Sequence, residues 1–281
     1  MNQPKFIDAA ITSVLTQNYP NLELIVADGG SSHDTLDILA ARQQKDRRLR
    51  YFSRPDRGPA HALNDAMALV RGTVIGWLNS DDLYASGAIE RSIKALAEQP
   101  SLLMVYGHGK HVDENGHQLG DYPTLPPTTP VLKFNEGCFI CQPTMFFRRS
   151  ARIVLGTLDE KLKAAFDFEY WLRAFCNFPD RIGFIDDVQA MSRLHDDCIT
   201  IRMRRTVALE GMQVLARHLG SAPKEWLLTY ANELLAQDPL DCGVENIREH
   251  LRTTADIAAA WMTQQEQRAL SSALTRLKYG D

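Results

Sequence analysis

Two short apolar runs, each followed by carboxylates, are the feature that most constrains the fold of the first hundred residues. Residues 22–27 and 73–78 are rich in Leu, Ile and Val and are bounded by turn residues, so we predict two buried strands. The first run leads into Asp28 and the second into the loop Asn79–Asp82. Apolar residues at helical spacing alternate with these strands, at 6–16 and again at 60–69. This alternation predicts an α/β fold whose parallel sheet is covered by helices on both faces.

Carboxylates are therefore expected at one edge of the sheet, because ligands in open α/β sheets bind beyond the carboxyl ends of the strands. The neighbouring side chains of Asp81 and Asp82 repel each other and gain little from that position unless they share a cation. Mg²⁺ or Mn²⁺ prefers such oxygen ligands and would also bind a diphosphate. From these residues alone, a solvated turn in which Asp82 caps the next helix is an equally good interpretation.

Beyond that loop we predict a helix at 86–98 with Ser86 as its N-cap, and then a change of pattern. The stretches 102–112 and 117–121 flank Asn115-Gly116, which predicts a hairpin because Asn-Gly tolerates the positive φ of a tight turn. The other predicted elements are strands at 142–148 and 182–185, a helix at 167–177, a short strand at 49–53 and, from Arg202 onward, helices broken near 220–223 and 239–243.

Composition narrows the class of protein. A chain of 281 residues can bury a full core, and its net charge of −4 gives no long-range reason to expect a nucleic-acid partner. No apolar run approaches the roughly 20 residues needed to span a bilayer. The five cysteines are odd in number and scattered, which favours a reduced, cytoplasmic setting. Cys138 and Cys141 have no second ligand pair at zinc-like spacing, so packing is the expected role of both.

Several segments resemble glycosyltransferase family 2, in the right order over roughly residues 1–200. Residues 10–31 are similar to the opening of that family, from Ala10-Ile11 through Tyr19-Pro20 to Asp28-Gly29-Gly30-Ser31. Further matching segments are Arg54-Pro55-Asp56-Arg57-Gly58, Ala62-Leu63-Asn64-Asp65-Ala66 and Gly76-Trp77-Leu78-Asn79-Ser80-Asp81-Asp82. The resemblance implies a GT-A nucleotide-diphospho-sugar transferase fold, a mixed and mostly parallel central sheet flanked by helices. It also implies a catalytic domain at 1–201, with a nucleotide-binding half at 1–100 and an acceptor-binding half at 101–201; the helical extension covers 202–281.

The resemblance also implies roles for five residues on the nucleotide side. Asp28 matches the residue that accepts a hydrogen bond from the base of the nucleotide. The alternative role for Asp28 is a loop cap for the helix that follows. Asp56 matches the next nucleotide-side carboxylate; otherwise it belongs to an ordinary turn. Asn79 stands where the family often has Asp, and it keeps the shape and an acceptor oxygen. Asp81 matches the position near the ribose and sugar, and Asp82 matches the metal ligand.

On the acceptor side, residues 158–162 and 166–173 resemble a second signature of the family. Asp167 falls where the family has its catalytic base, at a helix N-terminus whose dipole would favour the ionised carboxylate. An N-cap is the alternative role for Asp167, and Glu169 is the alternative base.

Ser192-Arg193-Leu194-His195 resembles the family's Arg-x-His segment, which implies that His195 completes the metal site or contacts the diphosphate. Three arginines follow at 202, 204 and 205. They would neutralise phosphate, contact anionic lipid headgroups, or simply form a solvated helix face.

Together these features predict an inverting glycosyltransferase that depends on Mn²⁺ or Mg²⁺. Its donor would be a UDP-, GDP- or dTDP-sugar, and its acceptor a hydroxyl of a glycan or a lipid-linked saccharide in cell-surface polysaccharide synthesis. We expect a cytoplasmic protein, or one at the inner face of the membrane. The alternatives are a catalytically impaired remnant that still binds nucleotide-sugar, and a sugar-phosphate nucleotidylyltransferase. The latter would need a Gly-rich, basic loop near the start of the chain, and this sequence has none there.

The start of the chain departs from the family pattern. The family opens on an apolar strand and a turn that touches the base, whereas this sequence reaches a helix at Phe6, and only Asn2-Gln3 matches the end of the turn. We therefore expect the first strand to be missing, through a misplaced start codon or a true deletion. A true deletion would leave backbone groups of the sheet unpaired and would weaken folding and nucleotide binding.

Overall fold

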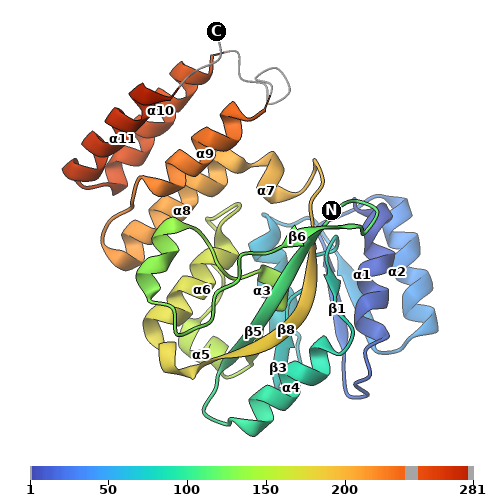
Figure 1. Ribbon diagram of the computed structural model, residues 1–281. Coiled ribbons are helices and arrows are strands. Elements are labelled where there is room, and N and C mark those ends of the chain that lie inside the picture. Colours follow the sequence, from blue (N-terminus) through green and yellow to red (C-terminus); the bar gives the residue numbers. More distant parts are fainter. Residues whose placement is uncertain (1, 238–245, 278–281) are drawn as a thin grey trace. The chain divides into compact units, whose positions relative to one another are not determined.

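The computed structural model describes residues 2–237 and 246–277, and the chain divides into two compact units (Figure 1). The first unit contains Met1–Thr129 and Phe139–Cys198, and the second contains Pro130–Cys138 and Ile199–Asp281. The division after Cys198 lies three residues before the end of the predicted catalytic domain. The structure also groups Pro130–Cys138 with the tail, which residue spacing did not predict. The indole Nε1 of Trp226 donates to the carbonyl of Phe134 at 2.9 Å and joins this segment to the tail helices.

A mixed sheet forms the centre of the first unit. Its two long strands, β5 (Met104–Val112) and β8 (Ile182–Arg193), pair in parallel, and the strand order is β3-β7-β5-β8-β4 with β6 paired to β5. The shorter strands are β3 (Val74–Gly76), β4 (Leu83–Tyr84), β6 (Gln118–Asp121) and β7 (Phe146–Arg148).

A second, two-stranded sheet carries the first acidic loop. β1 (Leu24–Asp28) pairs in parallel with β2 (Leu49–Ser53), with Asp28 opposite Ser53. Among the described residues no strand joins β1 to β3, so the expectation of one central sheet is wrong in that respect. Pairings between the described strands are two parallel and four antiparallel, which is more mixed than the mostly parallel sheet we expected. The α/β class is confirmed.

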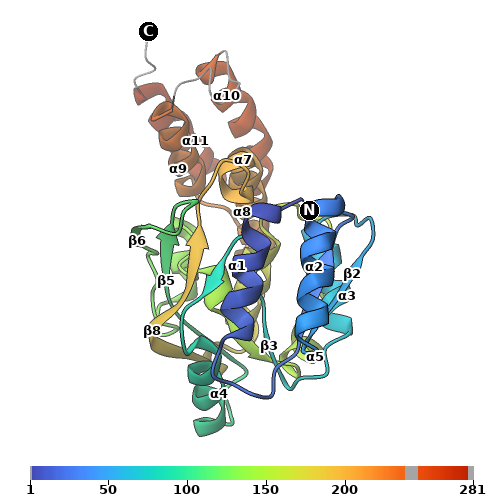
Figure 2. The same cartoon turned by 90° about the vertical axis from the view of Figure 1, so that its right-hand side faces the viewer.

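Six helices accompany the described strands of the first unit. α1 (Pro4–Leu15) and α2 (His33–Lys45) lie side by side (Figures 1 and 2), and Arg42 of α2 forms a bidentate ion pair with Asp8 of α1 at 2.5 Å. Ile7 and Ile11 pack with Leu39 and Leu49, which joins both helices to β2. The others are α3 (Pro59–Ala68), α4 (Ala88–Glu98), α5 (Ala151–Leu155) and α6 (Phe166–Asn177).

Three local predictions need correction. Gly87, not Ser86, is the N-cap of α4, and its φ of 76° is readily available only to glycine. Residues Gln142–Thr144 form a 3-10 turn before β7, because Pro143 fixes φ and offers no backbone donor to a strand. Strand 182–185 continues to Arg193, because Asp186 and Asp187 fall in a register shift and pairing with β5 resumes at Val188.

The second unit is helical. Its core contains Met212, Leu227 and Leu251, and the predicted break at 220–223 is confirmed by the left-handed C-cap Gly220. The predicted break at 239–243 and Cys242 lie outside the described residues. None of the helices that the structure describes has the length and apolar character to cross a bilayer. The described elements of the second unit are η1 (Val131–Glu136), α7 (Ile199–Arg202), α8 (Arg204–Leu219), α9 (Glu225–Leu235), α10 (Ile247–Ala258), η4 (Ala259–Trp261) and α11 (Gln264–Arg276). The 3-10 turn η3 (Pro179–Arg181) belongs to the first unit.

Candidate active site

Asp28 ends β1 and organises the loop that follows it. Its Oδ2 accepts from the backbone N–H groups of Gly30 and Ser31 at 3.1 and 2.8 Å and from the Ser53 hydroxyl at 2.5 Å, while Oδ1 accepts from the Ser31 hydroxyl. Burial by itself raises the pKa of Asp28, but these donors outweigh it and hold that pKa below its ordinary value. Asp28 is therefore an ionised carboxylate, only 7% exposed. Asp28 therefore fixes the loop whether or not it also binds the base of a nucleotide.

Asp56 lies directly against this loop. Its Oδ1 accepts from the N–H of Gly58 at 2.9 Å, and its Oδ2 lies so close to Gly29 that a side chain there would collide with it. The two carboxylates that the sequence assigned to the nucleotide are thus brought together, from the ends of β1 and β2.

This contact predicts the effect of a methyl group at Gly29. Gly29→Ala should push the Asp56 carboxylate aside and weaken nucleotide binding by roughly 1.5–3 kcal/mol, the usual value of one hydrogen bond to a charged group. The measurement is a calorimetric titration with UDP or GDP, with Gly120→Ala as the control because a Cβ there meets no atom within 4 Å. Equal affinity of Gly29→Ala and the unchanged protein would contradict the prediction.

Trp77 fixes the loop Asn79–Asp82. Its indole Nε1 donates to Oδ1 of Asn79 at 3.2 Å, and its carbonyl accepts from Nε2 of Gln142 at 2.9 Å. Nδ2 of Asn79 in turn donates to Oδ2 of Asp82 at 3.3 Å. Asn at this position therefore has a use that Asp would not have, since an amide donates to one neighbour while accepting from another.

Arg193 and His195, at the end of β8, bind the same loop from the other side. The backbone N–H of Arg193 donates to Oδ1 of Asp82 at 2.8 Å, and its guanidinium Nε donates to the carbonyl of Asp81 at 2.8 Å. Nε2 of His195 lies 3.0 Å from Oδ2 of Asp81, in a pair that is almost fully buried. Phe6 of α1 packs on both, with its ring 4.8 Å from the imidazole and 4.9 Å from the guanidinium carbon.

Asp82 is the more deeply buried of the two adjacent carboxylates, at 4% exposure. Desolvation and the neighbouring charge of Asp81 raise the pKa of Asp82 to about 8, against the opposing effect of the hydrogen bonds from Arg193 and Asn79. A carboxylate buried beside a second one is unfavourable for folding alone. A cation, or a proton, would offset that cost.

Asp167 lies in the first turn of α6, which reaches the loop through aromatic contacts. The ring of Phe166 stacks on Trp77 at 5.7 Å and 14°, and Trp171 contacts the same indole at 5.7 Å. The N-cap of α6 is Ala165, so the capping role considered for Asp167 is not the one observed. Burial raises the pKa of Asp167 to about 6, against hydrogen bonds that include a 2.7 Å donation from the Phe168 N–H.

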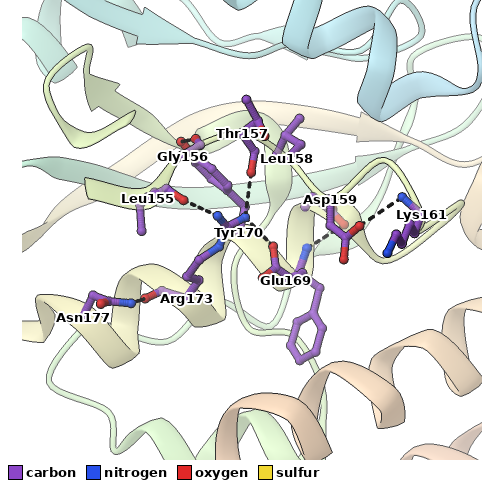
Figure 3. A network of polar contacts seen from close by, with 12 residues as sticks. Leu155, Gly156, Thr157, Leu158, Asp159, Lys161, Glu169, Tyr170, Arg173 and Asn177 are labelled. Atoms are coloured by element: carbon purple, nitrogen blue, oxygen red, sulfur yellow. Dashed lines mark hydrogen bonds and ion pairs between the residues drawn. The ribbon is translucent and has the colours of Figure 1, made fainter. Parts of the chain in front are cut away.

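Glu169, the alternative base, has a structural partner (Figure 3). It is 3% exposed and forms a 2.6 Å ion pair with Arg173, whose guanidinium also donates to the carbonyls of Leu155 and Thr157. This network attaches α6 to the segment after α5. The carboxylate of Glu169 is therefore engaged in a structural ion pair.

Several residues that hold the site were not singled out by the sequence for this role. Phe6 lies in the apolar pattern of the predicted helix at 6–16, and Trp77 and Arg193 belong to segments that match the family, with no role of their own predicted. Asn64 is a further case: its side chain exchanges hydrogen bonds of 3.0 and 2.9 Å with the backbone of Leu158 and so joins α3 to the acceptor-side segment. The available sign was the position of Asn64 at helical spacing from the apolar Ala60 and Met67, because an amide on the buried face of a helix needs partners.

The side chains around the carboxylate loop are of the kinds that bind a divalent cation. Among the described residues, no three His, Cys, Asp or Glu side chains are arranged as a metal site. Asp81 and His195 nevertheless face each other at 3.0 Å, with Asp82 beside them. Carboxylate and imidazole suit Mn²⁺, and a cation of this kind often takes only one or two protein carboxylates when substrate phosphates complete the shell. The residues therefore fit a cation shared with a bound diphosphate.

Comparison with known families agrees with this geometry. The family model described as glycosyl transferase family 2 matches residues 1–155, which is more than half of the chain. The chain belongs to glycosyltransferase family 2. The candidate residues Asp28, Asp56, Asn79, Asp81 and Asp82 fall within the matched segment.

Curated relatives are longer than this chain. An uncharacterized glycosyltransferase of Rickettsia conorii is 27% identical over 208 residues, which cover 70% of this chain and 33% of the relative. A chondroitin synthase of Escherichia coli is 29% identical over 172 residues, covering 61% of this chain and 25% of that protein. The chain thus spans a quarter to a third of the length of these relatives.

Solved structures confirm the GT-A fold. Staphylococcus aureus TarS residues 1–349 with UDP superposes with a TM-score of 0.61 at 17% identity, over 96% of this chain and 83% of that one. The mannosyltransferase PcManGT of Pyrobaculum calidifontis, in complex with GDP-Man and Mn²⁺, gives a TM-score of 0.58 at 19% identity, over 98% of this chain and 77% of that one.

Proposed function

We propose that this family 2 enzyme transfers a sugar, with inversion, from a nucleotide-diphosphate sugar to an acceptor hydroxyl in polysaccharide synthesis. The observation that carries the proposal is the grouping of Asp81, Asp82 and His195. The helix that contains Asp167 is joined to the same loop by the stacking of Phe166 on Trp77, whose indole donates to Asn79. Support also comes from a relative named chondroitin synthase and from similar folds that hold UDP, UDP-GlcNAc or GDP-Man.

We assign the nucleotide to the Asp28–Asp56 side of the site. Asp28 would accept a hydrogen bond from the base and Asp56 would bind the nucleoside next to it, while Gly29 leaves room for their close approach. Asn79 would contact the nucleotide-sugar from the next loop. Because Asp28 is ionised, its carboxylate can accept a strong hydrogen bond from an N–H group of the base of the nucleotide.

Asp167 is the proposed general base. As the acceptor oxygen attacks the anomeric carbon, the Asp167 carboxylate takes the hydroxyl proton, and the bond between the sugar and the nucleoside diphosphate breaks on the opposite face. The raised pKa of about 6 makes Asp167 a better proton acceptor than an ordinary Asp while leaving it ionised at neutral pH.

His195 and the paired aspartates are the proposed cation ligands. The sequence assigned the metal to Asp82 and His195 and the ribose side to Asp81. The direct contact with His195 makes Asp81 the carboxylate that would share the cation, with Asp82 behind it. A bound Mn²⁺ or Mg²⁺ would supply positive charge at the departing diphosphate. Arg193 fixes both aspartates through its backbone and side chain.

The test of the proposed function is release of nucleoside diphosphate from a panel of UDP-, GDP- and dTDP-sugars with Mn²⁺ present. Release from at least one donor, with an inverted anomeric product, is expected. Binding of nucleotide without release from any donor would identify the catalytically impaired remnant instead. Release of pyrophosphate from a nucleoside triphosphate and a sugar phosphate would identify a nucleotidylyltransferase.

Metal dependence gives a separate prediction. Chelation with EDTA should abolish release and added Mn²⁺ should restore it, and Asp81→Asn should raise the Mn²⁺ concentration for half-maximal activity by at least about tenfold. Asp121→Asn is the matched control, because this exposed carboxylate of β6 lies outside the site. Equal activity in EDTA and in Mn²⁺ would contradict the metal assignment.

The acceptor and the cellular setting are proposals as well. We propose that the acceptor is a glycan or lipid-linked saccharide and that transfer occurs in the cytoplasm, at the inner face of the membrane. Of the three arginines considered for lipid contact, Arg205 donates to Thr254 within the second unit at 2.9 Å, which favours a structural role for it.

A further inference from the structure

A cavity bordered by three arginines lies at the other end of β3 from the carboxylate loop. Its volume is about 650 Å³, and its lining includes Arg148, Arg149 and Arg152 together with Thr73, Ser150 and Thr157. Thr73 immediately precedes β3, whereas the loop Asn79–Asp82 follows it, so the cavity is separate from the site described above.

The three guanidinium groups are held in place by backbone carbonyls. Arg148 donates to the carbonyls of Leu102 and Leu96 at 2.7 and 2.6 Å. Arg149 donates to that of Arg71 at 3.1 Å, and Arg152 to that of Met67 at 2.6 Å. These contacts orient the positive charges without neutralising them.

No carboxylate within the described residues forms an ion pair with any of the three. Other arginines of this unit do have such partners, for example Arg42 with Asp8 and Arg48 with Asp46. Each guanidinium of the cavity also keeps N–H groups on at least one nitrogen that makes no hydrogen bond to the protein. Three uncompensated charges with remaining donors suit a phosphate group.

The wall and rim of the cavity add a second feature. Arg173 holds the wall by donating to the carbonyls of Leu155 and Thr157 on either side of Gly156 (Figure 3). On α5, Ile153 lines the cavity and is 86% exposed, and its neighbour Val154 is 59% exposed. Two adjacent aliphatic side chains standing in water beside three positive charges match the interface of an anionic bilayer, where apolar groups enter the acyl boundary and basic groups meet phosphates.

We infer that the Arg148–Arg149–Arg152 cavity binds the phosphate of an anionic lipid headgroup, with Ile153 and Val154 entering the bilayer interface. This surface docks the first unit on a membrane, and its position at the far end of β3 leaves the carboxylate loop unobstructed. The proposal is independent of the glycosyl-transfer reaction.

The test is cosedimentation of the full chain with vesicles of phosphatidylcholine alone or with 30 mol% phosphatidylglycerol, about the anionic share of a charged leaflet. Binding is expected only to the anionic vesicles, and it should weaken as salt rises. The double change Arg149→Gln with Arg152→Gln should lower affinity about fivefold for each charge, or roughly 30-fold for the pair. Ile153→Ser with Val154→Ser should also weaken binding, and because both side chains are exposed the fold should be unaffected.

Matched controls remove the same charge or apolar area elsewhere. Lys45→Gln with Arg47→Gln removes two exposed charges near the end of α2, and Leu119→Ser removes an aliphatic side chain that is 60% exposed on β6. Both controls should bind as the unchanged protein does. Equal binding by the cavity variants and the controls would overturn the proposal.

A second experiment, with inorganic phosphate as the probe, distinguishes a lipid headgroup from a soluble phosphate compound as the ligand of the cavity. Binding to anionic vesicles that is lost in the cavity variants supports the lipid headgroup. Phosphate binding detected by calorimetry and lost in Arg149→Gln with Arg152→Gln, together with no vesicle binding, would overturn the lipid proposal in favour of a soluble phosphate compound. Nucleoside diphosphate release from the cavity variants should stay unchanged in solution.

Discussion

Asp167→Asn is expected to lower kcat by roughly 10²–10⁴, the usual contribution of a positioned general base. Asn keeps the size of the side chain and can still accept the 2.7 Å hydrogen bond from the Phe168 N–H, so α6 should form as before. KM for the nucleotide-sugar should change little, because the donor is assigned to other residues. The measurement is steady-state release of nucleoside diphosphate.

The pH dependence of the activity tests whether Asp167 acts in its ionised form. Asp167 must be ionised to accept a proton, and burial raises its pKa to about 6, so activity should fall as the pH drops below about 6 and level off above it. The acidic limb should disappear from the residual activity of Asp167→Asn. Because the pKa is raised in the folded protein, ionised Asp167 opposes folding, and that loss of stability grows as the pH rises from the ordinary Asp value towards 6. Asp167→Asn should therefore be at least as stable as the unchanged protein at pH 7.

Asp180→Asn serves as the control for this change, since Asp180 is exposed in the turn after α6. It should leave both kcat and the pH profile unchanged. Retention of more than about a tenth of the activity by Asp167→Asn, with the acidic limb intact, would show that another group is the base.

Local patterns predicted much of the first unit because burial and periodicity coincide there. The strand Leu49–Ser53 has the predicted bounds, and α6 begins one residue before the predicted helix. In both segments the spacing of the apolar residues fits one type of secondary structure better than the other. The errors arose where long-range pairing overrides local sequence. β8 continues through Asp186 and Asp187 because β5 lies beside it, and no property of those two acids indicates a strand. The separation of β1 and β2 from the larger sheet likewise depends on which strands pair.

In the candidate site, too, local sequence predicted which residues matter, whereas their arrangement depends on long-range pairing. Asp28, Asp81 and Asp82 were predicted because each follows a buried strand, where ligands of α/β sheets bind, whereas Asp56 was predicted only through the resemblance to the family. Their mutual arrangement was not predictable, since Asp81 rather than Asp82 meets His195 only through the register of β4 with β8. The aromatic support from Trp77, Phe166 and Trp171 also depends on how α6 packs, which periodicity alone does not specify.

Trp171→Ala is expected to lower the free energy of unfolding by about 3–5 kcal/mol, the cost of removing a large aromatic from a packed core. Trp171 is 0% exposed and contacts Trp77, Phe147 and Tyr170 at ring distances of 5.7, 6.5 and 5.6 Å. Since proteins of this size are stable by only about 5–15 kcal/mol, this loss is a large fraction of the total stability. Urea denaturation followed by circular dichroism is the measurement.

Trp171→Phe separates packing from hydrogen bonding. The indole N–H of Trp171 has no hydrogen-bond partner among the described residues, so its loss removes no bond, and Phe should cost only about 1–2 kcal/mol through the smaller ring. Leu119→Ala, at an exposed position, should lie within about 0.5 kcal/mol of the unchanged protein. The folded fraction of Trp171→Ala should show a lower kcat, because Trp77 loses part of its support and with it the position of Asn79. Similar stability of Trp171→Ala and Leu119→Ala would mean that α6 does not depend on this aromatic cluster for its place beside the carboxylate loop.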